Sequence, residues 1–126
     1  MNIDSPTAAR GLAIAQATEA MLRSLGGREI TMLLPMRLEP GDCTGALEEV
    51  PVAPAVLRST GEDRFELLLG AKTANLIAEV RGFETADALF QAVVGFERGE
   101  TLLRIATVGV DTFAGEPYLY RLTLVA

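Results

Sequence analysis

The architecture is clearest in residues 94–125, whose sequence is VGFERGETLLRIATVGVDTFAGEPYLYRLTLV. A short strand is predicted over 94–96 and longer strands over 102–110 and 118–125, with a connection at 111–117. Both faces of the longer strands carry apolar side chains at several positions, which indicates that both faces are covered. A small antiparallel β-barrel, or a sandwich of two sheets, would cover them.

Three further strands are predicted upstream, over residues 28–37, 50–59 and 64–69. The first alternates apolar residues with others, whereas the second is interrupted by two prolines, which are tolerated at sheet edges or bulges. A turn containing glycine separates the last two, so they are expected to form a hairpin. Residues 38–49 are rich in turn-forming residues and predict a loop of about a dozen residues.

A helix is predicted over residues 5–25, with Pro6 at a favourable first position and Gly26 and Gly27 after its end. Apolar residues recur along it at three- and four-residue spacing. The residues of this stripe are Ile14, Ala17, Met21 and Leu25, with Thr18 between them and Leu22 alongside. The stripe is expected to lie either on the protein's own sheet or against another subunit.

Two short helices are predicted between the two groups of strands, over residues 72–81 and 85–93. Thr85 is the expected N-cap of the second helix. The apolar positions are Leu76, Ile77 and Val80 in the first helix and Leu89, Phe90 and Val93 in the second. We expect these positions to pack on the strands.

These elements predict a single α+β domain over residues 1–126. An N-terminal helix within 1–27 precedes a β-rich body over 28–126, which contains the loop at 38–49 and a helical insertion at 71–93. The body is expected to be a small antiparallel β-barrel or sandwich. The apolar fraction of 49% and the charged fraction of 22% are typical of a globular protein.

The composition argues against an enzyme. The chain has no histidine and one cysteine, Cys43, so the usual zinc sites and the usual histidine-dependent nucleophile and general-base arrangements lack their residues. No two carboxylates are placed together by the sequence pattern, as general acid–base catalysis by a carboxylate pair requires. We therefore expect no catalytic residues, no cofactor and no metal.

The charge argues against direct nucleic-acid binding. The net charge is −6, and the 11 basic residues are spread along the chain without a run that would neutralise phosphates. No apolar run approaches the roughly 18–20 residues of a membrane span, so no membrane partner is expected. The first residues lack a basic segment followed by an apolar one, so secretion through a signal peptide is not expected.

Acidic residues concentrate in residues 41–63, which carry −4 of the net charge of −6. The charged residues of this segment are Asp42, Glu48, Glu49, Arg58, Glu62 and Asp63. Two interpretations remain open: a mobile docking arm that becomes ordered on a partner, or a solvated loop without a partner. Under the first interpretation these six residues are interface candidates.

The closing strands supply the other interface candidates. These are Arg104, Tyr118, Tyr120 and Arg121. Tyrosine and arginine are favoured at the energetic centres of protein interfaces. Tyr118 and Tyr120 are predicted to share one face of the last strand with Leu122 and Leu124, and we favour the core for that face.

The closing hairpin comprises residues 99–105 (GETLLRI), 111–115 (DTFAG) and 117–125 (PYLYRLTLV). It resembles the closing hairpin of small neck proteins of tailed bacteriophages, the head-completion, head–tail joining or stopper family. The resemblance covers the last third of the chain in sequence, and the whole chain in the order of its elements.

The resemblance implies a barrel-like body that assembles as a ring of identical copies between the portal and the tail. Loops and the terminal helix would contact neighbouring subunits and the adjacent neck, portal or tail proteins. It implies no catalytic or cofactor residues, and a location in the virion or, during assembly, in the bacterial cytoplasm. Two alternatives remain: a small cellular binding or regulatory module, and an enzyme that uses carboxylates.

Overall fold

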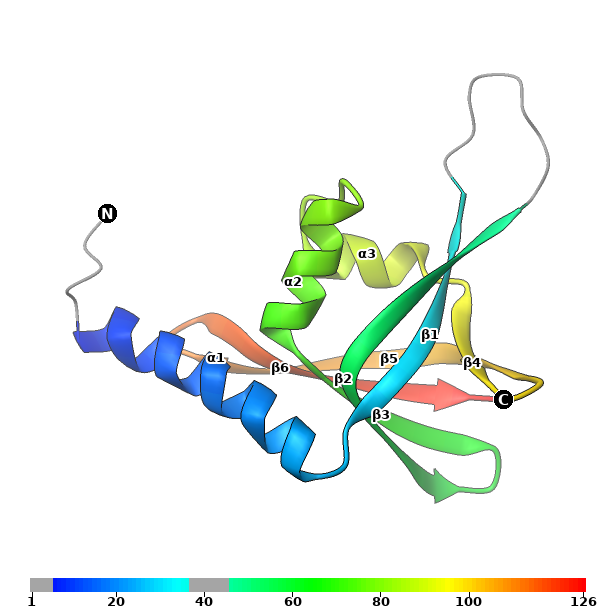
Figure 1. Ribbon diagram of the computed structural model, residues 1–126, viewed down its shortest axis with the longest axis horizontal. Coiled ribbons are helices and arrows are strands. Elements are labelled where there is room, and N and C mark those ends of the chain that lie inside the picture. The colour runs from blue at the N-terminus through cyan, green and yellow to red at the C-terminus, as the bar shows by residue number, and fades with distance from the viewer. Residues whose placement is uncertain (1–5, 37–45) are drawn as a thin grey trace.

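The computed structural model describes residues 6–36 and 46–126, which form a closed antiparallel barrel of six strands with three helices (Figure 1). The strands are β1 (Arg28–Pro35), β2 (Leu47–Gly61), β3 (Arg64–Gly70), β4 (Gly95–Arg98), β5 (Thr101–Phe113) and β6 (Glu116–Val125). Their order around the barrel is β1-β2-β3-β6-β5-β4. The predicted α+β class is confirmed, and the barrel replaces the alternative of a sandwich.

The three helices occupy two places on the barrel. They are α1 (Pro6–Ser24), α2 (Ala71–Val80) and α3 (Ala86–Ala92). Figure 1 shows α1 along the outside of the strands and α2 with α3 together at another side. Within the described residues, no helix is long and apolar enough to cross a membrane.

The barrel interior is filled by large apolar side chains that alternate along the strands. Those with no exposed surface are Met32, Val52, Leu67, Leu69, Phe96, Leu103, Leu122 and Leu124. Leu89 and Phe90 of α3 and the alanines of α2 belong to the same core. The predicted N-cap of α3 is confirmed, because Thr85 Oγ1 accepts a hydrogen bond of 3.1 Å from the Ala88 amide.

A second apolar cluster lies on the outer face of the barrel, under α1. Leu22 is fully buried there against Val56, Leu68 and Leu119, one residue from each of β2, β3 and β6. The helix therefore packs on the protein's own sheet, as one of the two interpretations expected. This explains why the strands are apolar on both faces.

The predicted stripe on α1 was wrong in detail. Met21 is 43% exposed, and Leu25, just after the helix, is 59% exposed, whereas the buried positions are Thr18, Glu19 and Leu22. Thr18 and Leu22, which the prediction placed within and beside the stripe, are buried, whereas Met21 and Leu25 are not. Likewise, α2 buries its alanines and leaves Leu76 and Val80 exposed.

Glu19 connects α1 to α2. Its carboxylate is 5% exposed and accepts hydrogen bonds from the Thr73 amide (3.3 Å) and from Thr73 Oγ1 (3.0 Å to Oε1). Thr73 lies in the first turn of α2, whose N-cap is Gly70, a residue without a side chain to accept such bonds. Glu19 thus accepts a hydrogen bond from one free amide at the start of α2, although it belongs to another helix, and this is the usual task of a capping side chain.

Several strands are longer than predicted. β2 begins at Leu47, so the predicted loop over 38–49 does not extend to Glu48 and Glu49. Both prolines of β2 lie in the part of the strand that pairs with β1 alone, where a missing amide donor is tolerated. The predicted connection at 111–117 shrinks to two residues, Ala114 and Gly115, both with positive φ.

We predict that Gly70→Ala destabilises the protein by about 1–3 kcal/mol, because overpacking a filled site forces its neighbours apart. A Cβ at this position would collide with the Glu19 carboxylate and displace it from Thr73. Gly61→Ala is the matched control, since the nearest atom to a Cβ there is Arg64 Cβ at 3.8 Å. Urea unfolding of both variants measures the difference, and equal stabilities would contradict the role of Glu19.

Candidate contact surface

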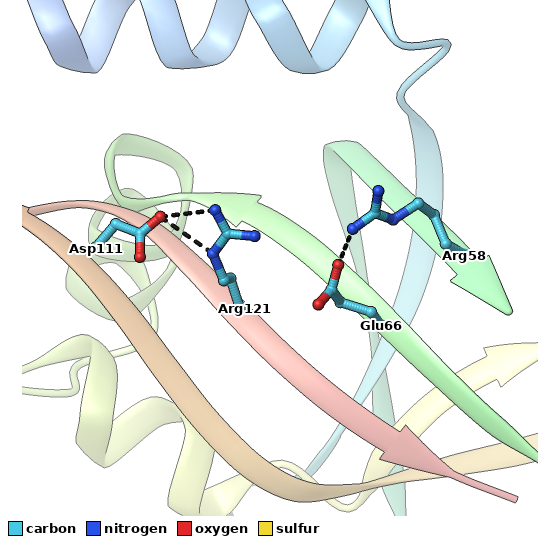
Figure 2. A network of polar contacts seen from close by, with 4 residues as sticks. All are labelled: Arg58, Glu66, Asp111 and Arg121. Atoms are coloured by element: carbon cyan, nitrogen blue, oxygen red, sulfur yellow. Dashed lines mark hydrogen bonds and ion pairs between the residues drawn. The ribbon is translucent and has the colours of Figure 1, made fainter. Parts of the chain in front are cut away.

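Four charged side chains form a ladder across the outer face of the barrel wall (Figure 2). Arg58 of β2 makes an ion pair with Glu66 of β3, its direct cross-strand neighbour. Arg121 of β6 donates two hydrogen bonds to Oδ2 of Asp111 of β5, from Nε at 3.1 Å and from Nη2 at 2.9 Å. The signs alternate from strand to strand, so this surface is charged but balanced.

The strand period places this ladder beside α1. Side chains two residues apart on a strand share a face. Arg58, Glu66 and Arg121 each lie two residues from one of the apolar side chains that pack under α1. The outer wall therefore has an apolar part covered by the helix and a charged part next to it. We call the four side chains of the charged part the charged ladder.

The charged ladder is accessible to a partner. The side chains of Arg58 and Arg121 are 56% and 46% exposed, and those of Glu66 and Asp111 are 26% and 32% exposed. The hydrogen bond to Asp111 and its negative charge raise the pKa of Arg121, which stays charged at any physiological pH. Exposed pairs of this kind contribute little to folding, about 0–1 kcal/mol each. Their groups can therefore exchange partners at an interface at low cost.

The acidic segment at 41–63 does not form a single arm. Glu48 lies in β2 and makes an ion pair with Arg81 at the end of α2, and Glu49 is exposed on the same strand. Glu62 and Asp63 form the turn between β2 and β3, with Asp63 at φ 55°. The docking-arm interpretation is therefore wrong for residues 46–63, because most of them are paired in the barrel. Asp42, like Cys43, lies outside the described residues.

The two tyrosines do not share a face. Tyr120 is 5% exposed and packs edge-on against Phe90, with ring centroids 5.0 Å apart. Tyr118 is the extra residue of a β-bulge, since Leu119 pairs with Asp111 and Pro117 with Thr112. It packs instead on the outer cluster under α1. The core interpretation is confirmed for Tyr120, which is thereby removed from the interface candidates.

The sequence interpretation missed Glu66 and Asp111. Neither was detectable from periodicity. A regular turn at residues 62–63 would place Glu66 opposite Ser59, and only the register shift between Ser59 and Gly61 brings it opposite Arg58. Asp111 depends in the same way on the bulges in β5 and β6. Arg104 is exposed on β5, where it pairs across the sheet with Val125, and it is not part of the charged ladder.

A groove of about 610 Å³ lies at one end of the barrel. Its wall combines Ile30, Leu57 and Leu67 with two arginines and two glutamates. Arg98 stacks over the Phe65 ring at 4.7 Å. Within residues 6–36 and 46–126, no three histidine, cysteine or acidic side chains gather as a metal site would require.

Comparisons with protein-family models, with curated proteins and with solved structures gave no match to this chain.

We predict that stability falls above pH 10 in a way that depends on Tyr120. Burial, and then the nearby Asp87 carboxylate, raise the pKa of Tyr120 above its usual value of 10.0. The unfolded chain therefore loses this proton first, so the contribution of Tyr120 is constant below pH 10 and decreases as pH rises through that value. Urea unfolding between pH 8 and about 11 should show a shallower decline for Tyr120→Phe.

Tyr118→Phe is the matched control and should keep the decline of the unmodified protein. Equal slopes for all three proteins would contradict the assignment of the effect to Tyr120.

Proposed function

We propose that this protein is a structural component of a phage or prophage virion, which assembles as a ring at the head–tail interface through protein–protein contacts. Its partners are other copies of itself and the adjacent neck, portal or tail proteins. The sequence of the β5–β6 hairpin, with its resemblance to phage neck proteins, supports this proposal. The order of helix, strands, helical insertion and closing hairpin agrees with the same resemblance.

The observation that carries the proposal is the distribution of exposed apolar side chains over separate elements. These include Leu12 and Met21 on α1, Leu76 and Val80 on α2, and Val108 and Val110 on β5. Exposed apolar groups mark contact sites where they adjoin one another, as Leu76 and Val80 do one helical turn apart on α2 and Val108 and Val110 do two residues apart on β5. A ring subunit between a portal and a tail needs contacts on several sides at once, and this distribution meets that need.

The charged ladder supports the same function in a different way. Charge pairs on an interface fix the orientation of partners more than they add affinity. The four groups are exposed and lie next to α1, so a neighbour that contacts α1 also meets the charged ladder. In this arrangement α1 supplies apolar contact, and the charged ladder sets the register between subunits.

The proposal predicts the outcome of deleting the gene from a strain that produces the particles. Electron microscopy of the lysate should show heads and tails that are not joined, and the wild-type gene on a plasmid should restore joined particles. The double variant Arg58→Gln with Arg121→Gln should restore fewer, because it removes both cations of the charged ladder. Lys72→Gln is the matched control, since this exposed cation lies on α2.

Joined particles at normal numbers in the deletion strain would contradict the proposal and favour the small cellular binding or regulatory module. Full restoration by the double variant would leave the function in place but remove the charged ladder from the contact surface.

A further inference from the structure

Half of β5 has a free edge. β4 pairs with β5 only from Thr101 to Leu103, whereas β6 pairs with it along its remaining length. No backbone hydrogen bond from the rest of the described chain reaches residues 105–111 on the other side. A groove of about 540 Å³ between α3 and this part of β5 keeps the edge accessible.

The free edge lacks most of the features that prevent pairing with another strand. Residues 105–110 read IATVGV, without a charge, a proline or a lysine, and are rich in β-branched residues. Residues 106–110 are all exposed, including Val108 at 42% and Val110 at 47%. An exposed strand of this kind is a template for strand addition.

A bulge gives this edge a self-complementary charge pattern. Arg104 and Asp111 are seven positions apart, a spacing that normally places side chains on opposite faces. Ala106 is an extra residue between the pairs Ile105–Leu124 and Thr107–Thr123, so the alternation shifts by one. Arg104 therefore shares the outer face with Asp111. The uncharged segment is therefore flanked by a positive side chain, Arg104, and a negative one, Asp111, on the same face.

We propose that two copies of this chain pair antiparallel along the free edges of β5, with Val108 at the two-fold axis. Antiparallel pairing places Arg104 of each copy opposite Asp111 of the second copy, whereas parallel pairing would oppose like charges. Within the described residues Arg104 has no ion pair, and Asp111 uses only Oδ2 for Arg121. Both groups are thus available to the second copy.

The register agrees with the geometry of an antiparallel ladder. Counting outward from Val108, Thr107 meets Gly109 of the second copy, and Ile105 meets Val110 once the bulge residue is passed over. Every opposed pair then lies on the same face of the joined sheet, as antiparallel pairing requires. The contact is isologous and closes on itself, so it forms a dimer and stops there.

The dimer is a separate proposal from the ring. It can be tested with the purified chain alone, so the outcome does not depend on the proposed function. Light scattering at a few hundred micromolar should give about twice the chain mass of 13.4 kDa. Val108→Lys places two like charges at the axis and should raise the dissociation constant about tenfold or more. Asn75→Lys, at an exposed position on α2, is the matched control and should leave the constant unchanged.

Cross-linking tests the register itself. In a chain with Cys43→Ser, Val108→Cys should oxidise to a covalent dimer, because opposed residues of an antiparallel pair lie within disulfide reach, about 4.5–5.5 Å between Cα atoms. Asn75→Cys, at an exposed position on α2, should not cross-link in the same background. The proposal is overturned by a monomeric wild-type protein at these concentrations, by an assembly that Val108→Lys leaves intact, or by equal cross-linking of the two cysteine variants.

Discussion

Three residue pairs between β1 and β4 close the barrel, and the rest of the structure depends on that short contact. Phe96 opposite Met32 places two fully buried side chains at the seam. Gly95 opposite Leu33 is required there, since a Cβ would come within 2.7 Å of the Leu103 carbonyl oxygen. A strand this short closes the sheet without covering the whole of its neighbour, so β5 continues past the seam with one side open.

The wall of the barrel packs against other parts of the protein on both of its faces. Its inner face holds the barrel core, and half of its outer face holds α1 through a single buried leucine and a buried glutamate. A buried carboxylate is costly unless its oxygens find donors. Thr73 supplies them at the start of α2, so the position of one helix is linked to the start of another. The charged ladder occupies the outer surface that α1 leaves uncovered.

Local patterns in the sequence predicted the order of the elements, because period-two and helical spacing, glycine stops and the Thr85 cap are local signals. They did not predict that α1 leaves Met21 exposed, or that α2 buries its alanines and leaves Leu76 and Val80 exposed, because packing between elements decides which side of a helix is buried. The local patterns also did not predict the bulges at Ala106 and Tyr118, because each bulge changes which side chains share a face without altering the apolar pattern. They did not predict the contact of Glu19 with α2, because its partner is 54 residues away in the sequence.

The docking site of α1 has a consequence for the order of events during synthesis. The helix leaves the ribosome before the strands of the barrel, but the surface that receives Leu22 includes Leu119 of β6. At about 5–20 residues per second, that surface is complete only some 5–20 s after the helix has been made. The helix is therefore translated before the surface on which it packs is complete, and its apolar side chains stay available to other proteins in the interval.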